Sequence, residues 1–200
     1  AKKTPTKRQP PGLKKKTERP IRYVSVQRGR DGKPHKRLPS VIKFKEIDTC
    51  DKKSRKFLGK GNQAMVYREK CGVRYLAVKE FKKKKYYDSE VNHLLEISKF
   101  PKCNEFVGCI YNGVATKTHY QMYMEMGDAD VWNAHTKRSY WNHPLTMSEF
   151  KDIARTLTKG LAFIHRNKIV HSDIKPENLL IIEGKVKYVD FGYACKGNKC

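Results

Sequence analysis

Several features that define well-known protein classes are missing from these 200 residues. No stretch approaches 18 consecutive apolar residues, so the sequence predicts no membrane-spanning helix and no membrane partner. The start has no secretory segment, and the six cysteines show neither a CxxC pair nor matching histidine spacing. These absences argue against a zinc site. They predict reduced thiols in a cytoplasmic or nuclear protein that is not secreted.

Acidic residues are scarce as well, with 20 Asp/Glu against 44 Lys/Arg and a net charge of +24. Residues 1–37 hold 14 Lys/Arg and two acidic residues, which is half of that charge. Such a segment cannot bury enough apolar surface to offset the entropy lost on ordering. We therefore expect residues 1–40 to be a basic, disordered N-terminal extension.

The composition of this extension leaves its role open. A basic tail binds nucleic acid or another polyanion through salt-sensitive phosphate contacts, and its Lys/Arg runs could also act as a nuclear import signal. A solvated extension with no dedicated partner explains the same composition.

Beyond residue 40 the apolar pattern predicts an α+β fold. Residues 41–48 alternate apolar and polar side chains and could form a strand that packs on the following domain. Further strands are predicted over 54–81 (three short ones), 106–115 and 119–126, with one helix over 86–100.

A longer helix is predicted behind Thr146, which with Glu149 forms a capping box. Apolar residues follow at helical spacing: Phe150, Ile153, Ala154, Leu157, Leu161 and Ile164. The order of elements predicts a five-stranded antiparallel lobe with one helix over 41–126. The start of an incomplete helical lobe follows over 127–200, with a cleft between the two.

Two features of the first lobe suggest phosphate binding. Gly59 and Gly61 would let a hairpin backbone pass close over a polyphosphate with N–H groups facing its oxygens, although glycine pairs also occur in ordinary turns. Lys79, in the middle of a strand, could neutralise phosphate charge if a carboxylate held it. Glu90 is the predicted partner, and Glu96 is the alternative.

The most specific cluster lies near the C-terminal end. Asp173 can orient an incoming hydroxyl, and Lys175 can neutralise a transferring phosphoryl group. Asn178 and Asp190 supply the oxygen ligands that Mg²⁺ requires. Gly192 is expected to give the backbone freedom to turn directly after Asp190. This spacing is hard to obtain from turn chemistry alone.

Across residues 54–192 the chain resembles the eukaryotic-type protein kinase family. Four motifs occur in the family's order: "GKGNQAMV", "LAVK", "HSDIKPEN" and "DFG",. The "KPEN" form is typical of Ser/Thr-directed kinases. The resemblance implies a bilobal fold and transfer of the γ-phosphoryl group of Mg·ATP to hydroxyl groups of a protein substrate.

The resemblance also implies roles for individual residues. Lys79 would hold the α- and β-phosphates and pair with Glu90, Asp173 would act as the base-like residue beside Lys175, and Asn178 and Asp190 would bind Mg²⁺. Met124 would lie behind the adenine, whose edge would bond to the backbone of the next two residues, and Asp130 could reach the ribose. The full set expected around ATP is Gly59, Gly61, Ala64, Val66, Ala77, Lys79, Met124, Glu125, Met126, Asp130 and Leu180.

The chain departs from the family pattern at four points. Ala64 replaces the third glycine, and Ser172 stands where many kinases have an arginine that binds an activation-loop phosphate. The short Lys79–Glu90 separation predicts a helix that starts close behind its strand. No activation segment follows Gly192, so we expect the N-terminal portion of a longer kinase. A natural short chain that binds nucleotide or acts as a decoy is the alternative.

Three other functions compete with an active protein kinase. A catalytically inactive kinase-like module is disfavoured because Lys79, Asp173, Asn178 and Asp190 are all present. A small-molecule phosphotransferase is disfavoured by Lys175 and the "KPEN" context. The third is a nucleic-acid-binding protein that carries a kinase-like domain, in which the tail defines the function. The tail could also tether a kinase to a polyanionic substrate.

Overall fold

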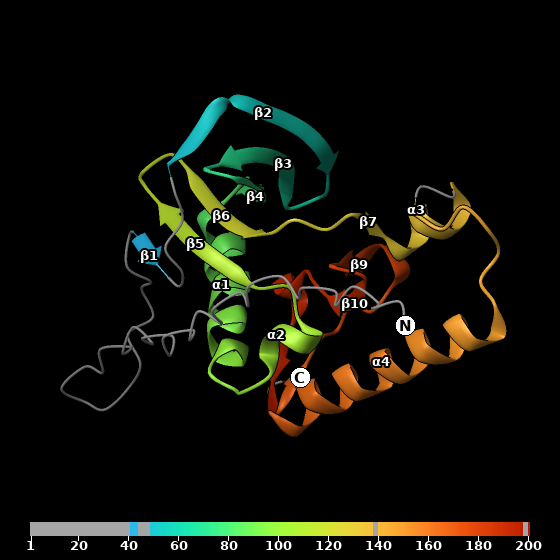
Figure 1. Cartoon of the computed structure of the whole chain (residues 1–200). Coiled ribbons are helices and arrows are strands. Elements are labelled where there is room, and N and C mark those ends of the chain that lie inside the picture. Colours follow the sequence, from blue (N-terminus) through green and yellow to red (C-terminus); the bar gives the residue numbers. More distant parts are fainter. Residues whose placement is uncertain (1–40, 44–48, 138–139, 198–199) are drawn as a thin grey trace, which may run out of the picture.

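A computed structural model of the chain describes residues 41–43, 49–137, 140–197 and 200. It has two lobes, with the sheet drawn at the top of Figure 1 and the helix-rich part below and to the right. The predicted N-terminal extension, residues 1–40, lies outside the described residues, as does the 44–48 part of the predicted first strand.

The N-terminal lobe is a six-stranded antiparallel sheet in the order β1-β5-β6-β4-β3-β2. Its strands are β1 (Val41–Lys43), β2 (Cys50–Lys60), β3 (Ala64–Cys71), β4 (Arg74–Phe81), β5 (Ile110–Ala115) and β6 (Tyr120–Glu125). The predicted count of five strands is wrong by one. Val41 pairs with Val114, so β1 joins the sheet at the edge of β5 rather than packing separately.

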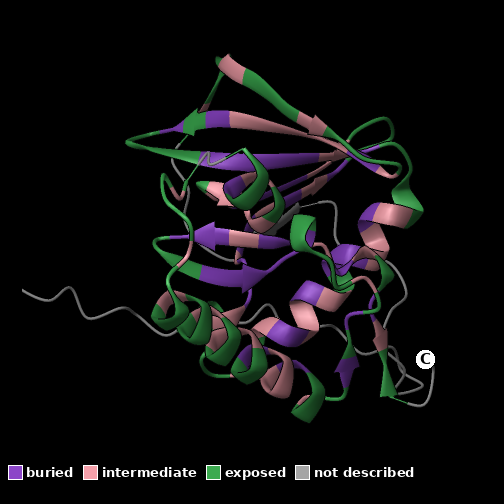
Figure 2. Cartoon of the chain, turned by 90° about the vertical axis from the view of Figure 1, so that its right-hand side faces the viewer, coloured by how far each residue is buried: buried purple, intermediate pink, exposed green. Residues whose placement is uncertain are grey.

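Helix α1 (Lys84–Ser98) packs against one face of this sheet. Tyr87, Val91 and Leu94 are buried at spacings of four and three residues, and with Met122 of β6 they belong to the main core. In Figure 2 the buried residues run along strands of the upper sheet and along the strands and helix faces below it. α1 begins three residues after β4 ends, which confirms the predicted short connection, and a one-turn helix, α2 (Cys103–Phe106), follows unpredicted.

The second lobe is built around helix α4 (Met147–Arg166) and a small hairpin. The predicted capping box is confirmed: Thr146 N–H donates to Glu149 Oε2 at 2.8 Å, and Glu149 N–H donates to Thr146 Oγ1 at 3.3 Å. The predicted apolar side chains of α4 are buried to different degrees. Ile164 is fully buried, whereas Phe150 is 58% exposed.

The remaining elements are short, and all of them follow β6 in the chain. They are β7 (Ala129–Asp130), α3 (Val131–Thr136), β8 (Ile169–Val170), the 3₁₀ turn η1 (Pro176–Asn178), β9 (Leu179–Ile182), β10 (Lys185–Tyr188), the 3₁₀ turn η2 (Phe191–Tyr193) and β11 (Cys195–Lys196). β9 lies between β10 and β7, and β8 pairs with β11. Within the described part of the chain, no helix is long and apolar enough to cross a membrane.

The cysteines depart from the sequence expectation of reduced thiols. Cys50 is bonded to Cys71, and Cys195 to Cys200. The first pair forms because the β2–β3 register places Cys50 directly opposite Cys71. Neither pair has CxxC spacing, so that motif does not indicate either bond.

The Cys50–Cys71 bond gives a stability prediction. It closes a segment of 21 residues that contains the β2–β3 hairpin. A cross-link of this span restricts the unfolded chain, so replacing both cysteines by serine should lower the free energy of unfolding by about 2–4 kcal/mol. Urea unfolding of the oxidised protein and of the double variant measures the difference. Equal midpoints and slopes would show that the bond does not stabilise the fold.

Candidate active site

A cleft of about 1100 Å³ lies between the two lobes. Val66 and Ala77 of the sheet form its roof, Leu180 forms part of its floor, and Met124 and Met126 line the connection between the lobes. These side chains leave an apolar slot that leads to the charged groups near α1. The slot suits a flat, largely apolar ring system with a charged tail.

The glycine-rich turn covers the charged end of the cleft. A Cβ atom added at Gly59 would meet no atom within 4 Å, so the absence of a side chain keeps space open there. Gly61 N–H donates to Ala64 O at 2.8 Å and closes the turn. That N–H is therefore already bonded, unlike the expectation that N–H groups of the turn face a phosphate.

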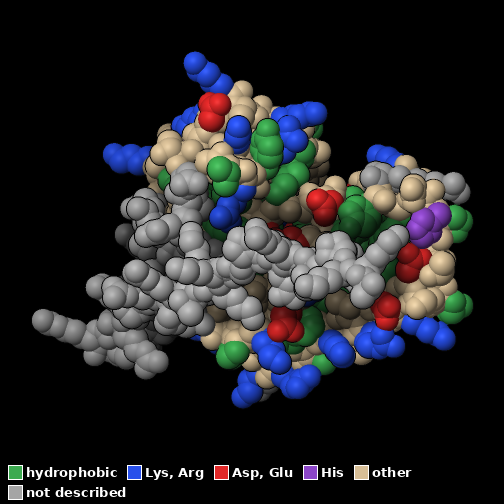
Figure 3. All heavy atoms as spheres, in the orientation of Figure 1, with side chains coloured by type: hydrophobic (Ala, Val, Ile, Leu, Met, Phe, Trp, Pro, Cys, Tyr) green, Lys and Arg blue, Asp and Glu red, His purple; other side chains and the backbone are tan. Residues whose placement is uncertain are grey.

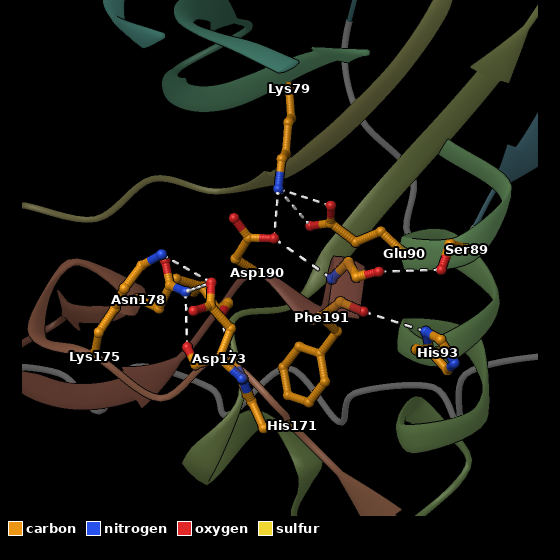
Figure 4. Close-up of polar contacts among 12 residues, drawn as sticks. Lys79, Ser89, Glu90, His93, His171, Asp173, Lys175, Asn178, Asp190 and Phe191 are labelled. Carbon is orange, nitrogen blue, oxygen red and sulfur yellow. Dashed lines mark hydrogen bonds and ion pairs between the residues drawn. The ribbon is translucent and has the colours of Figure 1, made fainter. Parts of the chain in front are cut away.

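Lys79 lies at the centre of an ion-pair network (Figure 4). Its Nζ lies 2.9 and 2.7 Å from the two carboxylate oxygens of Glu90 and 3.0 Å from Asp190 Oδ1. Glu90 is therefore the partner, and the alternative, Glu96, pairs instead with Lys99 and Lys196. The network joins β4, α1 and the segment after β10.

Burial has the largest effect on both members of the buried pair. It raises the pKa of Glu90 to about 7, and the attraction of Lys79 offsets this only in part. Burial alone would lower the pKa of Lys79, but the Glu90 and Asp190 carboxylates outweigh it, so that pKa is raised. Lys79 therefore stays a cation in the cleft.

Asp173 is held by two neighbours on the loop after β8. Its Oδ2 accepts from Lys175 Nζ and from Asn178 Nδ2, each at 2.8 Å, and its backbone oxygen accepts from the same amide at 2.9 Å. The hydrogen bond from Lys175 is the main reason why the pKa of Asp173 is lowered. Asp173 is thus an ionised acceptor at the edge of the cleft, with Lys175 beside it.

A buried histidine supports this loop from below. His171 Nε2 donates to Val189 O at 2.9 Å, and Asp173 N–H donates to His171 Nδ1 at 3.3 Å. Burial lowers the pKa of His171, so the ring remains neutral and can bond in both directions. The ring also packs on Phe191, with centroids 4.6 Å apart.

Gly192 serves a different purpose from the one expected. Its backbone does not need positive φ, whereas Asp190, two residues earlier, has φ of 62°. A Cβ atom at Gly192 would lie 3.2 Å from oxygens of Asp190 and Gln63. Glycine therefore avoids tight contacts with these two oxygens, and no positive φ calls for it.

Helix α1 contacts this same segment directly. Ser89 Oγ donates to Gly192 O at 3.1 Å, and His93 Nδ1 donates to Phe191 O at 3.2 Å. Figure 4 shows both side chains reaching from α1 to the backbone beyond Asp190. Sequence reasoning missed these contacts, because neither residue belongs to a motif.

Two oxygen atoms in this arrangement fit a Mg²⁺ ion. Asn178 uses its amide nitrogen on Asp173, so its Oδ1 is the atom left to bind a ligand,. Asp190 uses Oδ1 on Lys79, which leaves Oδ2. Amide and carboxylate oxygens are the ligands that Mg²⁺ prefers. The donor set therefore suits the ion.

The structure brings the predicted ATP-contacting residues to one cleft, with one exception. Of that set, which lies wholly within the described residues, Glu125 is not in the lining. Its N–H donates to Cys109 O, and its Oε2 accepts from Cys109 N–H and Lys187 Nζ, each at 3.0 Å. The prediction placed the adenine contact partly on this residue, whereas the lining continues from Met126 to Gly127.

Asp130, the predicted ribose contact, lines the cleft as well. Asp130 caps α3, where its two carboxylate oxygens accept from the backbone and side chain of Asn133. Lining residues that the sequence analysis did not select include Leu58, Gln63, Gly127, Asn133 and Val189.

Comparison with known proteins agrees with this geometry. The chain matches the family described as "Protein kinase domain" over residues 53–200. It belongs to the protein kinase family.

Individual relatives are distant. This kinase chain is 28% identical over 166 residues to "Serine/threonine-protein kinase MPS1" of Encephalitozoon cuniculi, covering 82% of the chain and 26% of that protein. It is 27% identical to "Dual specificity protein kinase Ttk" of Danio rerio (70% and 14%) and 29% identical to "Serine/threonine-protein kinase mph1" of Schizosaccharomyces pombe (68% and 21%). The chain thus spans about a quarter or less of the length of these relatives.

The raised pKa of Glu90 predicts a pH dependence of nucleotide affinity. Ionised Glu90 holds Lys79, so the holding charge is present above pH 7 and is lost as the pH falls through that value. Between about pH 8 and 6 the group goes from about nine-tenths to about one-tenth ionised. The affinity of the kinase for a fluorescent ATP analogue should therefore fall over this range toward that of Glu90→Gln.

Glu90→Gln also serves as the control for titration of the nucleotide itself. Its affinity should be low and should change with pH only as the phosphate groups titrate. Parallel curves for the two proteins would contradict a role of Glu90 ionisation.

Proposed function

We propose that this chain carries the phosphate-handling centre of an ATP- and Mg²⁺-dependent protein kinase that transfers the γ-phosphoryl group to Ser or Thr hydroxyls. The observation that carries the proposal is the facing pair of clusters in Figure 4. Lys79, Glu90 and Asp190 form one, and Asp173, Lys175 and Asn178 form the other. They occupy the charged end of a single cleft.

Positioning and charge stabilisation account for most of the catalysis in such a reaction, because phosphoryl transfer needs little covalent chemistry from the protein. Lys79, a cation held by Glu90, binds phosphate oxygens. Asn178 and Asp190 would hold Mg²⁺, which when bound neutralises charge on the phosphates. The free oxygen of Asp173 accepts the hydrogen bond of the substrate hydroxyl and aims it for in-line attack.

Lys175 completes the arrangement. Its ammonium lies 2.8 Å from Asp173 Oδ2 and is largely exposed, so it can turn toward an incoming phosphoryl group. The preference for Ser or Thr rests on the "KPEN" sequence that contains this lysine. The names of two relatives specify Ser/Thr kinases, and a third is named a dual-specificity kinase.

The decisive test is transfer of labelled γ-phosphate from Mg·ATP to a generic protein substrate, followed by phosphoamino-acid analysis. Asp173→Asn should reduce the rate by at least about 10²-fold, because the hydroxyl loses its acceptor. Asp152→Asn is the matched control, since that carboxylate is exposed on α4 and pairs with Arg155. Nucleotide binding without transfer by the unmodified chain would show that these residues bind but do not catalyse.

Ser172 gives a second prediction about activity. Its side chain lies 3.4 Å from Cys195 Sγ, a neutral contact that needs no phosphate. The Lys79–Glu90 pair is already formed, and α1 is already bonded to the segment after Asp190. We therefore expect activity to be independent of phosphorylation, with rates unchanged within about twofold after phosphatase treatment. Loss of activity after dephosphorylation would contradict this.

A further inference from the structure

The positive charge is concentrated in one part of the chain. The first 85 residues contain 29 Lys/Arg and seven Asp/Glu, a net charge of +22, and the other 115 carry +2. Within the folded lobe, residues 50–85 have 13 Lys/Arg and three Asp/Glu, a net +10. Figure 3 shows Lys and Arg side chains around the upper lobe. This lobe is therefore basic independently of residues 1–37.

The three acidic residues of this region are already bonded elsewhere. Asp51 Oδ1 accepts from the backbone N–H of Lys53 at 2.9 Å. Glu69 and Glu80 both pair with Arg55, the former at 3.3 Å. Asp51 is directly opposite Lys70 in the β2–β3 pairing, yet within the described residues the two form no ion pair, and no carboxylate is opposite Lys56 or Arg68.

Three cationic side chains and one aromatic side chain form what we call the basic strip: Lys56, Arg68, Lys70 and Tyr75. Lys56 of β2 is directly opposite Arg68 of β3, and Lys70 of β3 is directly opposite Tyr75 of β4. Val66, Arg68 and Lys70 alternate along β3 and so share one face, on which Val66 lines the nucleotide cleft,. The strip thus continues the cleft face toward the β3–β4 turn.

The strip combines cations with an aromatic platform. The Arg68 guanidinium lies over the Tyr75 ring at 4.3 Å from its centroid, and Tyr75 is 44% exposed. Arg68 Nε is buried with no hydrogen-bond acceptor among the described residues. Within that same part of the chain, no carboxylate pairs with Lys56, Arg68 or Lys70.

Protection of a sheet edge does not account for this arrangement. Lysines on an edge strand block pairing with another chain, and β2 is an edge strand,. That explains Lys56. It does not explain Arg68 and Lys70, which lie on β3 between two neighbours, or the exposed ring of Tyr75.

We propose that the basic strip binds single-stranded nucleic acid without sequence preference. Lys56 and Lys70 would contact backbone phosphates, and the stacked Arg68–Tyr75 pair would present a flat surface to a base. Basic grooves with aromatic platforms bind single strands in this way, because every base has a face that can stack. An acidic peptide would pair with the cations, but it has no base that could stack on the Arg68–Tyr75 pair.

The test measures fluorescence anisotropy of labelled oligothymidylate with the full 200-residue chain, over about 50 to 200 mM NaCl. The triple variant Lys56→Gln, Arg68→Gln, Lys70→Gln should bind at least tenfold more weakly. The slope of log affinity against log salt should fall by about 1.4, as expected for the two phosphate contacts of Lys56 and Lys70. Tyr75→Ala should weaken binding about tenfold without changing that slope.

The matched control removes three exposed lysines from other regions: Lys117→Gln, Lys151→Gln, Lys159→Gln. It loses the same charge and should bind within threefold of the unmodified chain. Equal weakening of both triple variants would overturn the proposal, because it would show that net charge and the N-terminal extension suffice. Thermal unfolding checks the fold. If the strip triple variant unfolds at a lower temperature than the unmodified chain, Lys56→Glu is tested in its place. This variant should also bind the oligonucleotide more weakly.

A competition experiment separates the other class of partner. A poly-glutamate peptide that displaces the oligonucleotide at equal concentration, together with an unaffected Tyr75→Ala variant, would overturn the assignment to nucleic acid. Each measurement reads binding rather than phosphate transfer. The outcome is therefore independent of whether the chain is an active kinase.

Discussion

The buried ion pair between Lys79 and Glu90 is the interaction on which the rest of the site depends. Lys79 lies in the middle of β4, and Glu90 lies on α1, whose apolar side chains pack against the sheet. Two charges removed from water destabilise a fold unless each is closely paired. The pair therefore fixes where α1 lies relative to the sheet, and with it the width of the cleft.

The same helix also determines the position of the segment after Asp190. Ser89 and His93 bond to backbone oxygens of Gly192 and Phe191, about 100 residues later in the chain. Lys196 reaches Glu96 on the same helix at 2.8 Å. Lys79 in turn contacts Asp190. A shift of α1 would thus move both Lys79 and Asp190, the proposed phosphate and metal ligands.

Sequence patterns predicted the parts of this site that depend on local chemistry. The capping box at Thr146 and Glu149 needs three residues of helix and no tertiary contact, so it could be identified directly. The motif residues around Asp173 could also be selected, because their offsets are fixed within one loop. The direction of Glu125 could not, since it depends on Lys187, which lies 62 residues away.

Other outcomes depended on register and close packing. The bond between Cys50 and Cys71 follows from how β2 pairs with β3, and spacing along the chain contains no trace of that register. The advantage of glycine at position 192 follows partly from an oxygen of Gln63, which approaches it from the glycine-rich turn. The basic strip likewise exists only once three strands are aligned. In each case the missing information is which segments meet.

The buried contact between Glu125 and Lys187 has a mechanical consequence. Glu125 ends β6 in the upper lobe, Lys187 belongs to β10 in the lower lobe, and Gly108 N–H also donates to Tyr188 O at 3.0 Å. The lobes are therefore fastened together behind the cleft, at its apolar end. Because α1 is bonded to Phe191 and Gly192 at the charged end as well, the lobes are linked at two places, and a rotation of one lobe against the other would have to break one of these sets of contacts,.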